Sequence, residues 1–407
     1  MTKKISKILL FVIACVIVLS IANDLLSYRI DRQAGTDFGR YHEYSGVIHI
    51  HTTYSDGSGS YAQLERLCDS LGLDFAIITD HNTVQPMKDS LANRFGVTLI
   101  VPAVEISTDG EHGHFLVIGD SVPLVPRNGV TSDSVFHDAL KKKSIVVLAH
   151  VFHPRGTLDW DDWNIGEFTG MELYNFDEGW RKDLSLLNIN KVLGAYIGYG
   201  LEPEALNYLL SYPDKEMKKF DELNLKRKVV GVGSLDAHAN MNLTRTLSWH
   251  FPSYQSLFEL VHTVIVTREA FDGTYHHDRE LLLKAIRGGN TFVSFSGLEE
   301  ARGFLFTATS VAGAQSDHPT EAIMGDSLRV ENSAILHVEI PDTDNVEAQI
   351  IWNGQILARF NNASSIDFPV VRAGEYRVQV FQKRVMVPFF MKRSFPWVIS
   401  NPIYIYR

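Results

Sequence analysis

Cysteine is scarce in this sequence, with only two among 407 residues, Cys15 and Cys68. Two cysteines cannot form the framework of several disulfides that holds small secreted domains together. They also cannot supply the three or four thiolates of a cysteine-rich zinc site. If the protein binds a metal, histidine and carboxylate side chains must therefore hold it.

An excess of basic residues is also missing. The chain has 38 Lys and Arg against 48 Asp and Glu, which gives a net charge of -10 at pH 7. Without a long basic run, this balance excludes a protein that binds the phosphate backbone of nucleic-acid polymers. It does not exclude a small anionic substrate, because bound divalent metals reverse the sign of the local field.

Only the N-terminus contains a long apolar run, Ile8–Ala22, which follows a basic start. This pattern is typical of a signal anchor or a signal peptide. Ser20-x-Ala22 is a possible cleavage site, and Val12–Cys15 has the form of a lipobox, so cleavage to a secreted protein or a lipoprotein is the alternative. We expect an anchor over residues 1–26 and a polar tether over 27–43. The lysines before the run then place the bulk of the chain outside the cytoplasm, in the periplasm or extracellular space.

The remaining sequence changes character once. Residues 44–296 alternate short apolar strands with helical stretches, which predicts an α/β fold with a parallel sheet or barrel. Residues 155–228 are longer than one crossover needs, and we expect them to form an insertion that covers the barrel mouth. Residues 297–407 are short strands separated by turns, with a hairpin signal at Asn353-Gly354, and predict an all-β, sandwich-like domain.

Residue types that bind metals end most of the N-terminal strands. In GVIHIH, His49 and His51 point to the same side because alternate strand residues do so, and Asp56 follows in a Gly/Ser loop. Further such residues end or begin other strands: Asp80, His81, Glu105, His112, His114, His150, Asp236 and His238. The carboxyl ends of parallel barrel strands open onto one face, so we expect these side chains to converge. The alternative is a set of solvated strand ends, and it applies most to His112, His137, His153, His276 and His277.

The order and spacing HxH…SDG, TDH, a strand-end Glu, a strand-end His and DxH resemble the PHP domain, named after polymerase and histidinol phosphatase. The resemblance covers residues 46–296. It implies a distorted (β/α)7 barrel with a site for two or three divalent metals. The C-terminal PWVISNPIYIYR resembles the corresponding module of the branch that includes carbaryl hydrolase.

The resemblance also implies individual roles. The first metal would be held by His49, His51, Glu105 and Asp236, the second by Glu105 as a bridge with His114 and His150, and the third by Asp56, His81 and His238. Asp80 is expected to orient a ligand. HGH leaves His112 open as an alternative to His114, which adjoins the strand. The family's proline follows His153, but His150 ends the apolar strand and is preferred as the ligand.

Imidazole and carboxylate ligands suit Zn²⁺, Mn²⁺ or Fe²⁺ and do not separate them. Two such metals that share Glu105 lower the pKa of a bridging water and hold the oxygens of a phosphoryl group. Arg155 is a candidate for binding a phosphate or carboxylate and His153 for protonating a leaving group, with surface positions as the alternative for both.

The sequence therefore predicts a metal-dependent hydrolase that acts on small phosphate esters. The same centre would equally attack an ester, amide or carbamate carbonyl, which is the second hypothesis. A catalytically inactive surface module whose β domain binds glycan or cell wall is the third. The expected partners are an anionic small-molecule substrate and the membrane, through the N-terminal segment. We expect no nucleic-acid polymer, and no protein partner is evident.

Overall fold

The computed structural model describes residues 40–107, 113–119, 123–126, 130–184, 189–199, 203–244, 247–249, 252–311, 321–341, 344–386 and 391–407. The predicted anchor, most of the predicted tether and His112 lie outside these residues. Within the described ranges, no helix is long and apolar enough to cross a membrane. The first described strand, β1 (His42–Ile48), already includes the last two residues of the predicted tether.

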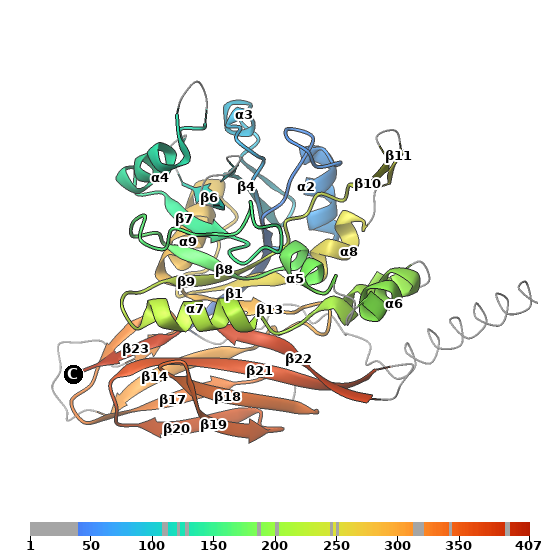
Figure 1. Ribbon diagram of the computed structural model, residues 1–407. Coiled ribbons are helices and arrows are strands. Elements are labelled where there is room, and N and C mark those ends of the chain that lie inside the picture. The colour runs from blue at the N-terminus through green and yellow to red at the C-terminus, as the bar shows by residue number, and fades with distance from the viewer. Residues whose placement is uncertain are drawn as a thin grey trace, which may run out of the picture.

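Figure 1 shows an α/β part above a β-rich part. The largest sheet runs through both parts. Its strands in the α/β part are β1, β2 (Phe75–Ile78), β3 (Asn93–Phe95), β4 (Thr98–Pro102), β12 (His262–Thr267) and β13 (Thr291–Ser294), in the order β13-β12-β1-β2-β4-β3. Strands β1, β2 and β4 are parallel, whereas β12 and β13 run antiparallel to their neighbours. Every residue of β2 is buried, as expected for a strand covered on both faces.

A second sheet has the order β5-β6-β7-β8-β9. Its strands are β5 (Val104–Ile106), β6 (His114–Ile118), β7 (Ile145–Ala149), β8 (Gly170–Asn175) and β9 (Val230–Ser234). Only β7, β8 and β9 are parallel, so the expectation of a uniformly parallel sheet is wrong. Residues 107–113 between β5 and β6 are too few for a parallel crossover. Because β6 is antiparallel, its first residue, His114, lies opposite Ala149 at the end of β7.

The ends of the two sheets meet along one edge. An isolated parallel bridge pairs Ile50, after β1, with Ala237, after β9, and another pairs His81, after β2, with Glu105 in β5. The backbone N–H of His51 donates to Ala237 O at 3.0 Å, which ties the same two segments together. Residues that end strands in different sheets are thereby brought side by side.

Helices and a small hairpin surround these sheets (Figure 1). They are α2 (Tyr61–Ser70), α3 (Gln85–Lys88), α4 (Ser132–Lys141), α5 (Phe176–Lys182), α6 (Ile189–Tyr199), the 3-10 helix η1 (Pro203–Leu209), α7 (Asp214–Asn224), α8 (Tyr254–Phe258) and α9 (Tyr275–Gly288), with the hairpin β10 (Met241–Thr244) and β11 (Leu247–Trp249). Helix α3 ends at Lys88. Residues 93–95 form β3, which pairs antiparallel with β4 through a turn at Gly96, whose φ is 57°.

The predicted insertion has two locations in the fold. Its helix α5 supplies Trp180 and Arg181 to the cavity described below. Helix α7 lies against the β-rich part instead, where Arg377 donates two hydrogen bonds to Asp221, at 2.8 and 2.9 Å. The insertion therefore lines the cavity with one helix and joins the two parts with another.

The β-rich part consists of two sheets that share one hydrophobic core. The four-stranded sheet contains β15 (Glu321–Ile323), β14 (Leu305–Val311), β17 (Ser333–Glu339) and β20 (Ser365–Val370). The other strands belong to the large sheet: β16 (Ser327–Arg329), β18 (Val346–Trp352), β19 (Gln355–Asn361), β21 (Gly374–Met386), β22 (Met391–Ser400) and β23 (Ile403–Tyr406). Alternate residues of β17 are buried, and its Leu336 packs in one core with Val378 and Trp397 of the other sheet.

The hairpin predicted at Asn353-Gly354 is confirmed, because these two residues connect β18 to β19. Their φ angles are 48° and 76°. Two positive φ angles are typical of the tight turns that match the twist of the flanking strands.

Strand pairing crosses the predicted domain border at residues 296 and 297. Strand β13 pairs antiparallel with β22, with Phe292 opposite Ser400. The side-chain amide of Asn401 donates to Gly231 O and to Thr291 O, both at 2.9 Å. The two parts are therefore connected by backbone hydrogen bonds within one sheet.

Candidate metal centre

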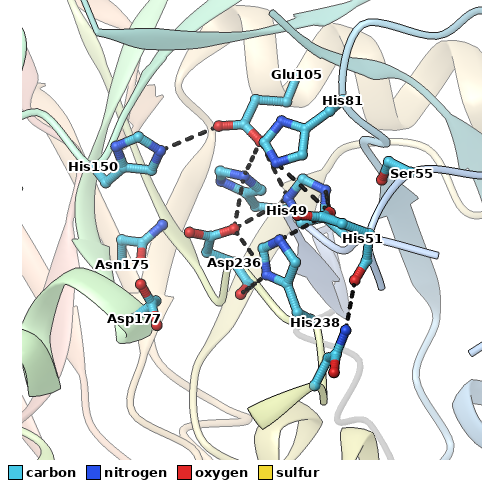
Figure 2. A network of polar contacts seen from close by, with 12 residues as sticks. His49, His51, Ser55, His81, Glu105, His150, Asn175, Asp177, Asp236 and His238 are labelled. Atoms are coloured by element: carbon cyan, nitrogen blue, oxygen red, sulfur yellow. Dashed lines mark hydrogen bonds and ion pairs between the residues drawn. The ribbon is translucent and has the colours of Figure 1, made fainter. Parts of the chain in front are cut away.

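The residues predicted to bind metal lie together where the strand ends of the two sheets meet (Figure 2). They come from the ends of β1, β2, β7 and β9, from the middle of β5 and from the start of β6. They are His49, His51, Asp56, His81, Glu105, His114, His150, Asp236 and His238. These segments are far apart in the sequence, so it is the fold that brings the side chains together.

Three of these residues have a left-handed backbone. The φ angles of His49, His150 and Asp236 are 67°, 30° and 53°. Such conformations are uncommon outside glycine and add about 1–3 kcal/mol of strain each. All three residues follow closely on strand ends, and all three belong to the cluster. The chain therefore tolerates strain at the positions that form the site.

Glu105 lies at the centre of the cluster and is fully buried. Its Oε2 lies 3.0–3.2 Å from nitrogens of His49, His51 and His81. Its Oε1 lies 2.8 Å from His114 Nδ1 and 3.1 Å from His150 Nε2. Each carboxylate oxygen thus faces a separate group of imidazoles, which is the arrangement that a ligand shared by two metals needs.

Asp236 faces the first of these groups from the opposite side. Its Oδ1 lies 3.1 Å from His51 Nε2 and 3.3 Å from His49 Nε2. In Figure 2, Asp236 and Glu105 approach these two imidazoles from different segments of the chain. Two nitrogens and two carboxylate oxygens therefore surround one point.

A third group lies nearer the solvent, around Asp56. Its Oδ1 lies 3.2 Å from His238 Nε2 and 3.8 Å from both His51 Nδ1 and His81 Nε2. The Asp56 side chain is 58% exposed. His51 and His81 each present one ring nitrogen to Glu105 and the other to Asp56. Sequence reasoning assigned each to a single metal, whereas the structure places both between two groups.

Negative charge dominates the buried part of the cluster. Burial alone would raise the pKa of Glu105, but the surrounding imidazoles, those of His81 and His49 above all, hold that pKa well below its usual range. Burial likewise opposes ionisation of Asp236, yet His49 and His238 hold its pKa well below the ordinary value. Both carboxylates are therefore ionised at neutral pH and attract a cation.

The pKa values of two histidines in the cluster are shifted upward. Burial lowers the pKa of His150, but the hydrogen bond to Glu105 outweighs it and raises that pKa to about 9. Burial also opposes the protonation of His238, whose pKa the charges of Asp236 and Asp56 raise to about 9. In the absence of metal, protons supply the positive charge that this group of carboxylates favours. A metal has to displace them when it binds.

The donor atoms fit divalent metals. Several are buried and make no hydrogen bond within the part of the chain that the structure describes: His49 Nε2, both ring nitrogens of His51, His81 Nδ1, Glu105 Oε2 and Asp236 Oδ1. A buried polar atom without a partner costs roughly 1–3 kcal/mol, so such a concentration calls for a ligand. Nitrogen and oxygen donors in this ratio suit Zn²⁺, Mn²⁺ or Fe²⁺.

Asp80 contributes no atom to the cluster but holds the loop that carries Asp56. Its Oδ1 accepts hydrogen bonds from the backbone N–H of Thr52 and from the hydroxyl of Ser55, both at 2.7 Å. Its Oδ2 accepts from the Thr52 hydroxyl at 2.8 Å. With its carboxylate occupied by this loop, Asp80 has the position of an orienting residue.

A cavity of about 530 Å³ opens beside the cluster. It is lined by residues of the cluster and by His153, Arg155, Asp177, Trp180 and Arg181. Arg155 is exposed, and its guanidinium makes no hydrogen bond or ion pair with the described residues. The lining of the cavity thus combines an available cation with donor atoms for further cations.

His153 is buried in this wall and has a defined orientation. Its Nδ1 accepts a hydrogen bond from the backbone N–H of Arg155 at 3.1 Å, so the neutral ring carries its proton on Nε2. That nitrogen lies 3.6 Å from Asp177 Oδ2. Burial would raise the pKa of Asp177, but its contacts with His153 and Arg181 keep it below the usual value.

Sequence reasoning missed two acidic residues here. Asp177 is the second residue of α5, which follows directly after β8, and Glu172 lies within the buried strand β8. A glutamate in the otherwise apolar run GMELYN was the available signal, because an unpaired carboxylate is seldom buried. His137 and His277, by contrast, are on α4 and α9 and contribute nothing to the cluster around Glu105.

Neither a protein-family model nor a curated protein matches this chain. Among solved structures, it is similar to a two-domain protein of Bacteroides vulgatus that contains a predicted PHP-like metal-dependent phosphoesterase. The TM-score is 0.43 and the identity 13%, over 91% of this chain and 99% of that one.

Two further structures each match 47% of this chain and 87% of their own, at 12% identity. One is a proposed metal-dependent phosphoesterase from Bifidobacterium adolescentis, with a TM-score of 0.27, and the other an amidohydrolase from Chromobacterium violaceum with bound sulfate, with a TM-score of 0.29. At such low scores the chemistry of the site has to follow from its own residues.

Proposed function

We propose that the protein is a metal-dependent hydrolase of small phosphate esters, built on a distorted (β/α)7 barrel of the PHP kind. The observation that carries the proposal is the set of buried, unpartnered nitrogens and oxygens that surrounds Glu105. The carbaryl hydrolase-like branch remains part of the proposal through the sequence resemblance of the β-rich part.

The proposed ligands fall into three groups. His49, His51, Glu105 and Asp236 would hold one metal, Glu105, His114 and His150 a second, and Asp56, His81 and His238 a third. Divalent metals there would lower the pKa of bound water and neutralise the oxygens of a phosphoryl group. The two ionised carboxylates would offset the charge of the metals within the buried centre.

Residues of the cavity wall would act on the rest of the substrate. Arg155, which no described carboxylate neutralises, would bind a phosphate oxygen by charge-assisted hydrogen bonds. The Nε2–H of His153 would donate a proton to the leaving oxygen. Arg155 favours an anionic substrate over a neutral ester or carbamate, which is why phosphate esters rank first.

The test is a substrate screen on the full chain, supplied with Mn²⁺ or Zn²⁺, against phosphate esters, carboxyl esters and carbamates. We expect metal-dependent turnover of phosphate esters, and Arg155→Ala should raise KM about tenfold or more, which corresponds to about 1.4 kcal/mol. Arg66→Ala, which changes an exposed arginine of α2, is the matched control. Turnover restricted to carbonyl substrates would replace the proposal by the second hypothesis, and no turnover with any metal would contradict both.

We also propose that the apolar run Ile8–Ala22 anchors the protein, with the metal centre outside the cytoplasm. The support is the basic start followed by an apolar segment. A reporter enzyme fused after Arg407 should then be active only outside the cytoplasm. Strong cytoplasmic reporter activity without an external signal would refute this location.

A further inference from the structure

A carboxylate outside the predicted ligand set contacts two of its members. Glu172 lies within β8, between Met171 and Leu173, and is fully buried. Burying an ionised carboxylate is unfavourable unless hydrogen bonds satisfy its oxygens. Here both oxygens are satisfied, and two of the three contacts are made by residues of the cluster.

The first contact determines which nitrogen of His49 faces the cluster. His49 Nδ1 lies 2.7 Å from Glu172 Oε1, and His49 Nε2 points to Glu105 and Asp236 without a hydrogen bond. A carboxylate accepts hydrogen bonds, so in the neutral form of His49 that binds a metal, Nδ1 carries the proton and Nε2 offers its lone pair. This is the tautomer that a metal ligand at Nε2 requires, and a carboxylate behind a ligating histidine commonly selects it.

The second contact involves the backbone of another predicted ligand. The N–H of His150 donates to Glu172 Oε2 at 2.6 Å, at a residue whose φ is 30°. In this strained conformation the His150 ring reaches Glu105 Oε1. Glu172 stabilises the backbone that places the ring there, because without the carboxylate this buried N–H would lose its acceptor.

The third contact is a second hydrogen bond to Glu172 Oε2. The side-chain amide of Asn175 donates to Glu172 Oε2 at 2.9 Å, and Asn175 Oδ1 accepts from the N–H of Glu178 at the start of α5. Two N–H donors therefore converge on Oε2, while His49 Nδ1 contacts Oε1. One side chain on β8 therefore links a ligand at the end of β1 to a ligand at the end of β7.

We infer that Glu172 is a positioning residue of the metal centre, which fixes the tautomer of His49 and the backbone of His150 at the same time. The inference rests on the proposed metal binding but not on any substrate. Through His49 and His150, Glu172 contacts both groups of imidazoles that face Glu105. The outer group around Asp56 makes no contact with Glu172 among the described residues.

The experiment is a calorimetric titration of metal-free full chain with Mn²⁺, comparing wild type with Glu172→Gln. The amide keeps the shape but offers one acceptor where three donors converge, so metal affinity should fall about 10–100-fold. Glu375→Gln is the matched control, because Glu375 is also a buried strand glutamate but lies in the β-rich part. Wild-type affinity and stoichiometry in Glu172→Gln would overturn the inference.

A second measurement covers the case in which Glu172→Gln does not fold. In the Zn²⁺-loaded wild type labelled with ¹⁵N-histidine, the His49 ring should carry its proton on Nδ1, with the resonance assigned by its loss in His49→Gln. A His49 ring protonated on Nε2 would refute the role of Glu172. Absence of any metal binding by the wild type is a separate outcome, which would refute the metal centre itself, and absence of hydrolysis would affect neither readout.

Discussion

The two parts of the protein use left-handed backbone for different purposes. In the described β-rich part, the non-glycine residues with positive φ are Asn345, Asn353 and Asn362, which lie in turns and bends between strands. Asparagine adopts this conformation readily because its short side chain makes local hydrogen bonds. In the α/β part, such residues include His49, His150 and Asp236 of the metal cluster. The β-rich part uses the conformation where the chain turns or bends, and the α/β part uses it at candidate ligands as well.

Buried polar atoms without a hydrogen-bond partner are also distributed differently between the two parts. Among the described residues after position 297, the buried side-chain atoms without a hydrogen bond belong to Glu375 alone. In the α/β part, many of them converge on the point faced by Glu105 and Asp236. The comparison indicates that the β-rich part is satisfied by its own contacts, whereas the α/β part retains donor atoms for a cation.

The largest effect should come from Glu105→Gln. The amide has nearly the same shape but no negative charge, and both of its terminal atoms face imidazoles that a metal would bind. We expect metal content to fall and turnover of a responsive phosphate ester to drop on the order of 10³-fold, which corresponds to about 4 kcal/mol of barrier. Metal analysis of the purified variant beside kcat/KM checks this.

His137→Ala is the control for that variant, since it removes an exposed histidine of α4. It should leave both metal content and turnover near wild type. If Glu105→Gln kept wild-type metal and turnover, the convergence of ligand atoms on Glu105 would have no functional meaning.

Leu336→Ala should have a large effect on the free energy of unfolding and little effect on metal content. This side chain is fully buried in the core of the β-rich part, and a Leu-to-Ala change at such a site costs about 2–5 kcal/mol. We expect a lower midpoint in urea unfolding, with unchanged metal content in the folded fraction. Val371→Ala, at an exposed position, should be neutral. Loss of metal from folded Leu336→Ala would show that the two parts are not energetically separate in this respect.

The stability of the metal-free protein should depend on pH because of two histidines in the cluster. The folded-state pKa values of His150 and His238 are raised to about 9, above the ordinary value of 6.5. Their contribution to stability is therefore complete below about 6.5 and is lost as the pH rises through 9. The Tm of the metal-free protein should fall over this range, and the fall should be smaller in His238→Gln. An equal fall in that variant would remove His238 from the explanation.

The smallest effect concerns Glu375, the described residue of the β-rich part whose buried oxygens have no hydrogen bond. Burial raises the pKa of Glu375 to about 8, while the unfolded chain ionises near 4.5. Stability due to this group is therefore present below about 4.5 and lost as the pH rises through 8. Glu375→Gln should raise Tm by a few degrees at pH 9 and change it little at pH 4. The exposed Glu331→Gln is the control, and a Tm unchanged at pH 9 would contradict the buried-charge explanation.

Local patterns allowed much of this structure to be predicted. The alternation along β17 and the Asn353-Gly354 turn depend on neighbouring residues, so the sequence carries both signals directly. The helix Tyr61–Ser70 was predictable for the same reason. The strand-end positions of His49 and Asp236 were enough to place both among the candidate ligands.

The features that escaped prediction depend on distant parts of the chain. The direction of β6 follows from the short connection after β5, yet the regular alternation of strands and helices favoured a parallel sheet. His51 shows no sequence feature that would place it between Glu105 and Asp56. The burial of a glutamate in GMELYN was signalled by the sequence, but the contacts of Glu172 were not, because its partner His49 is separated from it by 123 residues.

The pairing of β13 with β22 has a consequence for how the protein is made. Strand β13 is finished when the ribosome reaches Ser294, but its partner begins only at Met391. Until then, one edge of the sheet that carries β1 and β2 has open N–H and C=O groups, which other chains can pair with. The candidate metal centre is thus attached to a scaffold whose last hydrogen-bonded neighbour is synthesised late, and an unpaired edge of this kind favours aggregation until that neighbour is made.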